Sequence, residues 1–323
     1  MSSTDTPITP PQAISAEKKK GKGLLHDARI NWQLHVVLLL PLIYIVVFKY
    51  VPMYGAQIAF RDFMPLKGIW GSDWVGIKNF KKFFMSYQFA TVMKNTIGIS
   101  AYSLVAGFPI PIFLALALNN ADSRVYKKTV QMATYAPHFI STVVMAGIIL
   151  RMLSPHTGII NHIVKALGAE PVAFMSEPRL FKTVYVITGI WQNAGWGTII
   201  YLAALSSINP TLHEAALVDG ATRVQRTWHI DVPGIMPTAV ILLILNTGRI
   251  MNVGFEKVFL LQNPLNLTSS EIIQTYVYKI GLGSSLPDYS FATAVGLFNS
   301  LINLALLLVV NSIARKLGET SLW

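Results

Sequence analysis

The sequence predicts an all-α integral membrane protein with six transmembrane helices. Hydrophobic residues make up 53% of the 323 residues and charged residues only 13%, against about 25% charged in a typical soluble domain. So few charges could not cover a water-facing surface of this size, which indicates that lipid is the solvent. The apolar residues also fall into separate runs of about 20, the length that a helix needs to cross a bilayer. There is no cysteine, which excludes disulfides, iron–sulfur clusters and cysteine-ligated zinc.

Six apolar runs are long enough to serve as spans. The first follows the basic segment Lys18–Lys22 and is expected to remain uncleaved, because no small-residue cleavage pattern follows it. Two prolines, Pro109 and Pro111, interrupt the second. The predicted spans cover residues 32–51, 95–118, 130–153, 181–205, 235–255 and 292–313.

Positive charge near short loops indicates the orientation. Six spans place both termini on one side, and the basic cluster before Trp32, together with that at 124–128, favours a cytoplasmic position. Residues 1–30 are then a disordered basic cytoplasmic tail, 31–318 a six-span domain and 319–323 a short cytoplasmic tail. The net charge of +11 belongs to clusters beside apolar runs, so we expect no nucleic-acid partner.

The segment 207–233, between the fourth and fifth predicted spans, is expected to fold as helix, sharp turn and helix. Asn209 suits an N-cap, with Pro210 at the first helical position. Gly220 falls where a helix ends in a left-handed residue, and Thr222 can cap a second short helix before Pro233. Such a projection can dock in a partner's groove. An ordinary amphipathic re-entry loop is the other interpretation.

The same segment carries a motif. Glu214-Ala215-Ala216, then Gly220, and then Ile230 and Pro233 resemble, at matching spacing, the EAA loop of binding-protein-dependent ABC importer permeases. Val232 departs from the family pattern, which has leucine there. The resemblance implies the type I ABC importer permease fold and a loop that docks on a cytoplasmic ATPase. The residues it assigns to ATPase coupling are Glu214, Ala215, Ala216, Asp219, Gly220, Ile230 and Pro233.

Further runs resemble sugar-type permeases of the LplB-like branch, relatives of the maltose permeases. These runs are Pro52–Phe63, Gly71–Phe84, Trp191–Leu205 and Asn263–Leu265. The resemblance implies import of oligosaccharides from a polysaccharide, with uronic-acid polymers such as alginate favoured. It also implies a bacterial cytoplasmic membrane and three kinds of partner. These are a second related permease (a heterodimer favoured, a homodimer open), two ATPase subunits and an extracytoplasmic binding protein.

The chain is not expected to be an enzyme. No G-x-x-x-x-G-K-[ST] pattern occurs in it, so ATP and Mg are expected on the partner ATPases and no cofactor on this chain. His156 and His162 share no helical register, so no metal site is expected. A secondary transporter, a facilitator of sugars and a membrane scaffold subunit are the alternatives. The lack of acidic residues in the fourth and sixth predicted spans speaks against ion coupling but not against a facilitator.

Polar residues inside the spans are the candidate substrate path, because such residues tend to face protein or water. Amides and a guanidinium suit sugar hydroxyls, and aromatic faces suit sugar rings. The candidates are Trp191, Gln192, Asn193, Trp196, Asn246, Arg249, Asn252, Asn299 and Asn303. Three-residue steps are expected to place Asn246, Arg249 and Asn252 on one side of the fifth helix. Hydrogen bonds between helices are the ordinary explanation for all of them. Arg249 is the most informative candidate, since an acidic sugar would neutralise it.

Overall fold

The computed structural model describes residues 32–316, so the predicted tails at 1–30 and 319–323 lie outside the described residues. The chain divides into two compact units, the first ending at Gly55 and the second beginning at Ala56.

The first unit is an apolar helix. α2 (Trp32–Ile45) continues through a π-helical turn, η1 (Val46–Tyr50), into the 3-10 helix η2 (Val51–Phe60). The π turn closes with a hydrogen bond from the Val51 N–H to the Val46 carbonyl, and Pro52 follows directly. In a regular helix the proline ring would collide with the carbonyl four residues earlier, so the widened turn lets the helix continue.

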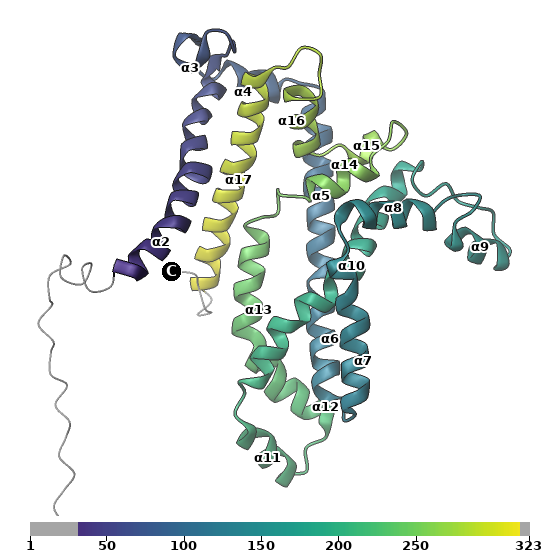
Figure 1. Ribbon diagram of the computed structural model, residues 1–323. Coiled ribbons are helices and arrows are strands. Elements are labelled where there is room, and N and C mark those ends of the chain that lie inside the picture. Colours follow the sequence, from purple (N-terminus) through teal and green to yellow (C-terminus); the bar gives the residue numbers. More distant parts are fainter. Residues whose placement is uncertain (1–31, 317–323) are drawn as a thin grey trace, which may run out of the picture. The chain divides into compact units, whose positions relative to one another are not determined.

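The second unit is helical apart from one short hairpin, in which Arg61 pairs with Trp74 in antiparallel register. Figure 1 labels most of its elements. They are β1 (Arg61–Asp62), α3 (Gly68–Gly71), β2 (Asp73–Trp74), α4 (Lys78–Phe84), α5 (Gln88–Gly107), α6 (Pro109–Asn120), α7 (Arg124–Tyr135), η3 (Ala136–Phe139), α8 (Thr142–Met152), α9 (Ile159–Ala166), α10 (Pro178–Ser206), α11 (Pro210–Val218), α12 (Arg223–Arg226), η4 (Thr227–Asp231), α13 (Val232–Thr247), α14 (Phe255–Leu261), α15 (Leu267–Ser270), α16 (Ile273–Gly281) and α17 (Tyr289–Lys316).

Several of these helices have the length and apolarity of membrane spans. Within residues 32–316 there are four such stretches, Trp32–Phe60, Gln88–Asn120, Arg223–Thr247 and Tyr289–Lys316. The bent pair Arg124–Phe139 and Thr142–Met152, counted as one span, would make a fifth. α10, with 29 residues, is also long enough, but it is not among those four; its middle carries the polar pair Gln192 and Asn193.

The third predicted span, 130–153, is not one straight helix. Arg124–Phe139 and Thr142–Met152 meet at a bend of 104°. Pro137 lies in the 3-10 turn η3, and Ser141 then takes an extended conformation as the N-cap of α8. Its hydroxyl accepts a hydrogen bond from the Val144 N–H at 3.4 Å. A proline followed by a new N-cap ends one helix and starts another, which the apolar composition of this segment did not reveal.

The fifth predicted span, 235–255, is displaced toward the N-terminus. Its helix is continuous from Arg223 and ends at Thr247. Arg249 and Asn252 therefore lie in the turns after α13, and the prediction that they share a helix face with Asn246 is wrong. Those turns are closed by N–H bonds from Arg249 to the Asn246 carbonyl and from Asn252 to the Arg249 carbonyl, at 3.1 and 2.8 Å.

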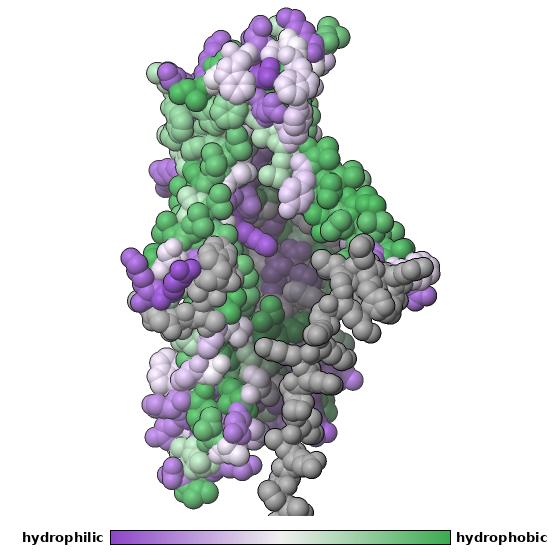
Figure 2. Space-filling view, turned by 90° about the vertical axis from the view of Figure 1, so that its left-hand side faces the viewer, coloured by the Kyte–Doolittle hydropathy of each residue, from purple (hydrophilic) through white to green (hydrophobic). Residues whose placement is uncertain are grey.

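Buried apolar side chains join the helices that surround the site. One cluster contains Ile99 of α5, Met145 of α8, Phe181 of α10 and Val258 of α14. A second gathers around Phe83 of α4, and a third links α6, α10 and α13. Figure 2 shows wide hydrophobic patches on the face in view, with hydrophilic residues gathered at its upper end.

Candidate functional site

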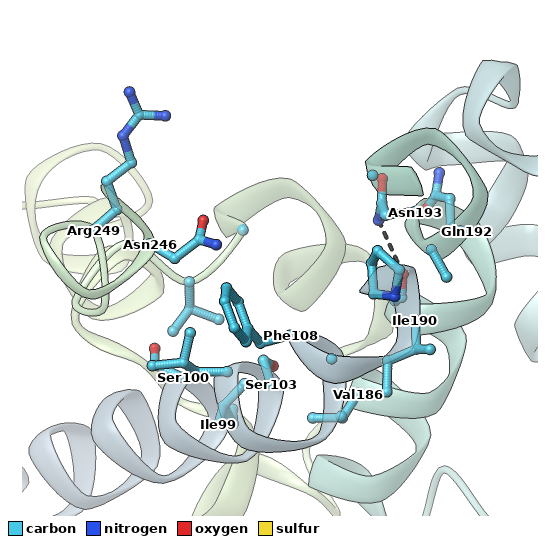
Figure 3. Close-up of a pocket in the computed structure, with 18 of the residues that line it drawn as sticks. Ile99, Ser100, Ser103, Phe108, Val186, Ile190, Gln192, Asn193, Asn246 and Arg249 are labelled. Carbon is cyan, nitrogen blue, oxygen red and sulfur yellow. Dashed lines mark hydrogen bonds between the residues drawn. The ribbon is translucent and has the colours of Figure 1, made fainter. Parts of the chain in front are cut away.

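A cavity of about 550 Å³ lies among α5, α6, α10, α13 and the segment that follows α13. Phe108, at the junction of α5 and α6, lies near its centre in Figure 3. Asn246 and Arg249 stand on one side, and Gln192 and Asn193 of α10 stand on the other. Amide and guanidinium groups thus line one cavity from α10, from the end of α13 and from the turn that follows it.

The structure separates the candidate path residues into two groups. Five of them line the cavity: Gln192, Asn193, Asn246, Arg249 and Asn252. Four others do not line it: Trp191, Trp196, Asn299 and Asn303. Whether any of them contacts substrate stays a prediction.

The two asparagines of α17 position Asn252. The side-chain N–H groups of Asn299 and Asn303 both donate to Asn252 Oδ1, at 3.2 and 3.1 Å. Asn303 Oδ1 in turn accepts from the Met251 N–H at 3.0 Å. Gln274 of α16 donates to the Met251 carbonyl at 2.6 Å. These bonds hold the turn after α13 against two other helices, which is the interhelical bonding that polar residues in spans ordinarily provide.

Gln192 and Asn193 have structural partners as well as a place on the cavity wall. Gln192 Nε2 donates to the Ile140 carbonyl at 3.2 Å, just after the bend between η3 and α8. Asn193 Nδ2 donates to the Gly189 carbonyl at 3.0 Å, and its Oδ1 lies 3.1 Å from His138 Nδ1. The α10 amides therefore fasten the bend to the cavity wall.

The tryptophans of α10 lie outside the cavity. Trp196 stacks on His138 with ring centroids 4.6 Å apart and an interplanar angle of 5°, and meets Phe139 edge-on. Trp191 and Trp196 remain 49% and 44% exposed. Each therefore has a free face in this single chain.

The cavity has basic side chains and no acidic ones. Arg249 and Lys257 line it, and no aspartate or glutamate is among the described lining residues. The Lys/Arg–Asp/Glu ion pairs recorded between described residues lie elsewhere, at Lys82–Asp288, Arg223–Asp122 and Lys279–Glu271. The cavity wall is thus electropositive, which favours anionic or polar contents.

Lys257 was not predicted from the sequence. Its Nζ donates to the Tyr185 carbonyl of α10 at 3.1 Å and lies 4.8 Å from the centre of the Tyr185 ring. α14 lies outside the candidate spans, and burial there lowers the pKa of Lys257 to about 8. In the sequence, Lys257 stands out only as a lysine among apolar residues, three positions after Gly254. The sequence does not reveal its contact with Tyr185 of α10, 72 residues earlier.

The segment 207–233 has the predicted local geometry. Asn209 Oδ1 accepts from the Thr211 N–H at 3.1 Å, and Gly220 has φ of 76°. Thr222 and Gln225 form a reciprocal capping box. The predicted caps and the left-handed glycine are confirmed.

The second helix of this segment is longer than expected. α12 does not stop before the membrane helix but continues through the π turn η4 into α13. The Val232 N–H bonds to the Thr227 carbonyl, and Pro233 follows, the same arrangement as at Pro52. A widened turn before each proline keeps the helix continuous. Arg223 Nη1 also reaches Asp122 Oδ2 at 2.8 Å, and Asn120 Nδ2 donates to Thr227 Oγ1 at 2.9 Å, which ties α12 to the end of α6.

The exposed surface of α11 and the turn that follows it combines apolar side chains with two acidic ones, Glu214 and Asp219. Glu214 and Ala215 are exposed, while Ala216 and Ile230 are half-buried. The large exposed apolar side chains are Leu212, Leu217, Val218, Val224 and Trp228. Such a face suits a groove on a partner protein.

Comparisons with known proteins agree with these features. Residues 107–319 match the family of binding-protein-dependent transport system inner membrane components. The chain is 40% identical to Protein LplB of Bacillus subtilis (strain 168), over 94% of this chain and 95% of LplB. It is 41% identical to the polygalacturonan/rhamnogalacturonan transport system permease protein YteP of the same organism, over 96% of each.

Solved structures are similar over the same extent. One is a crystal structure of a bacterial ABC transporter involved in import of the acidic polysaccharide alginate, with TM-score 0.83, 41% identity and coverage of 91% of this chain and 98% of that one. Another is a bacterial alginate ABC transporter in complex with an alginate pentasaccharide-bound periplasmic protein. Its TM-score is 0.84 at 40% identity, covering 93% of this chain and 99% of that one.

The helical fold, the cavity and the matched sequence define a membrane transport subunit rather than a catalytic one. The chain belongs to the family of binding-protein-dependent transport system inner membrane components. It is a multi-pass protein of the bacterial inner membrane and a permease of a sugar or oligosaccharide ABC importer in the LplB-like branch.

Proposed function

We propose that this permease carries acidic, uronic-acid oligosaccharides in an ATP-driven importer. The observation that carries the proposal is the charge of the cavity, where Arg249 and Lys257 have no acidic neighbour among the described lining residues. Arg249 is exposed in this single chain, so its guanidinium is accessible to an anionic ligand, whereas Lys257 is buried. A carboxylated sugar supplies that anion through charge-assisted hydrogen bonds. The amides of Asn193 and Asn246 suit its hydroxyl groups.

The names of the relatives support an acidic cargo. YteP is described as a polygalacturonan/rhamnogalacturonan transport permease. The structural neighbour is described as importing the acidic polysaccharide alginate. Both polymers carry carboxylates on their sugar rings, which is the chemistry that a basic cavity selects.

The partners follow from the same proposal. A second related permease pairs with this chain, as a heterodimer rather than a homodimer, and two ATPase subunits bind ATP and Mg. An extracytoplasmic binding protein delivers the oligosaccharide, as the periplasmic protein in the neighbouring structure carries an alginate pentasaccharide. This chain binds no nucleotide, metal or other cofactor.

The exposed face of α11 and α12 docks on an ATPase subunit, with the residues of the EAA motif at the contact. Closure of the ATPases on ATP moves this loop, and α12 transmits the movement because it is continuous with α13. Alternating access requires that the two states bind ATPase and substrate with different affinities.

Six spans with cytoplasmic termini complete the proposal, with α10 and the bent pair counted as spans. Single-cysteine labelling tests this topology, since the chain has no cysteine of its own. Val218→Cys and Leu66→Cys replace two strongly exposed residues. An impermeant maleimide added outside intact cells should label the second and not the first. The reverse pattern would refute the orientation.

The function itself is tested with the complex in proteoliposomes, together with its partner permease, ATPases and binding protein. Alginate pentasaccharide should be taken up and should stimulate ATP hydrolysis, and a neutral glucose pentasaccharide should do so much less. Equal uptake of both, or uptake of the neutral sugar alone, would refute the acidic specificity.

A further inference from the structure

We infer that Lys257 is a second substrate-binding cation of the cavity. Arg249 binds one carboxylate of the oligosaccharide, and Lys257 binds another carboxylate of the same molecule. The inference rests on the proposed function. It adds that the cavity takes at least two uronate units at once, held by cations from two segments, the turn after α13 and the helix α14.

The position of Lys257 is unusual for a lysine. Lys257 is only 7% exposed. It nevertheless lines the cavity and forms no ion pair with a described acidic side chain. Lysine is rarely buried without a partner, because the charged amine loses its hydration. The Tyr185 carbonyl and ring replace only part of that hydration.

The amine retains donors for a ligand. An ammonium group has three N–H donors, and the described contacts use one of them, on the Tyr185 carbonyl at 3.1 Å. The wall beside it has no side chain at Gly189, where an added Cβ would lie 3.5 Å from Nζ. Gly189, on the cavity wall, thus leaves that side of the amine open.

A structural joint between α14 and α10 is the competing explanation. A joint of that kind needs packing and one donor, which a neutral side chain provides without the cost of burying a charge. The cavity supplies no compensating negative charge, since no aspartate or glutamate is among its described lining residues. Burial therefore opposes a charged Lys257 in the empty cavity, and an anionic ligand relieves that cost.

The first test compares substitutions at Lys257 in the reconstituted complex. Lys257→Gln keeps a donor and loses the charge, and Lys257→Arg keeps the charge. Lys165→Gln removes one exposed charge outside the cavity and serves as the control. The concentration of alginate pentasaccharide for half-maximal uptake should rise about tenfold in Lys257→Gln, the factor that corresponds to about 1.4 kcal/mol, and change little in Lys257→Arg and Lys165→Gln. An unchanged value in Lys257→Gln, or an equal loss with a carboxyl-reduced pentasaccharide, would overturn the inference.

The second test needs no substitution. Acetylation of lysines in the wild-type complex is followed by peptide mass spectrometry with and without alginate pentasaccharide. The sugar should slow acetylation of Lys257 and leave Lys165 unaffected. If the wild-type complex takes up the sugar and Arg249→Gln weakens uptake, but Lys257 is not protected, the inference alone fails. If the wild-type complex does not take up the sugar at all, the proposed function fails and the inference fails with it.

Discussion

His213 Nε2 lies 3.3 Å from Oδ1 of Asp231, whose side chain is only 2% exposed. The contact joins α11 to the π turn η4, so the projecting helix is held to the membrane helix by a pair 18 residues apart in the chain.

We therefore expect His213→Ala to loosen the loop. Asp231 Oδ1 forms no hydrogen bond among the described residues, so losing its 3.3 Å contact with the imidazole would leave a buried carboxylate oxygen unsupported, at a cost of about 1–3 kcal/mol. ATPase subunits should copurify less well and uptake should fall, while His213→Gln, which keeps a donor, should recover part of both. Normal copurification in His213→Ala would show that the pair does not position the loop.

Gly220→Val should weaken ATPase association. At φ of 76° a side chain strains the backbone by about 1–2 kcal/mol, and β-branched residues fit worst. Gly168→Val is a matched control, because Gly168 has φ of 81° and, like Gly220, nothing near the position of its missing Cβ. Copurification of the ATPase should fall only in the Gly220 variant. Equal loss in both would indicate a general folding defect.

Glu214→Lys should also reduce ATPase binding and transport, since it reverses the charge at an exposed acidic position of α11. The helix itself should persist, because glutamate and lysine have similar helix propensities. Copurification with the ATPase measures the effect. Full transport with bound ATPase would contradict the docking role.

Arg249→Gln should raise the half-saturating concentration for acidic oligosaccharides. Losing a charge-assisted pair in a partly wet cavity costs about 1–3 kcal/mol, or about five- to 150-fold in affinity. Arg249→Lys keeps the charge and should lose less. A similar loss with neutral oligosaccharides would indicate that Arg249 stabilises the helices instead.

Binding of an acidic oligosaccharide should weaken as the pH rises through about 8. The pKa of Lys257 is lowered by burial from 10.5 to about 8, so its positive charge is present below that pH and lost above it. Tyr185 is the titratable side chain in contact with the amine, and Arg249 is the other charged group on the wall. Uptake of alginate pentasaccharide between pH 7 and 9 measures the effect. Lys257→Arg should abolish the fall, and a fall that persists in this variant would assign the effect to another group.

The local structure of the coupling segment was predictable from sequence. The N-cap Asn209, the left-handed Gly220 and the cap Thr222 each depend on residues within three positions along the chain. The apolar runs at 32–51, 95–118 and 292–313 likewise lie inside helices, because composition alone makes water a poor solvent for them.

Contacts between distant segments decided the rest. The turn after α13 is held by hydrogen bonds with Asn303 of α17 and Gln274 of α16, which a periodic pattern does not encode. Asn252 receives its hydrogen bonds from residues 47 and 51 positions away. Lys257 reaches the cavity by lying against a helix 72 positions earlier. The sequence by itself thus determined which segments are helical and apolar and how the coupling loop turns. Only the tertiary structure decided which side chains share the cavity, because that depends on which helices pack together.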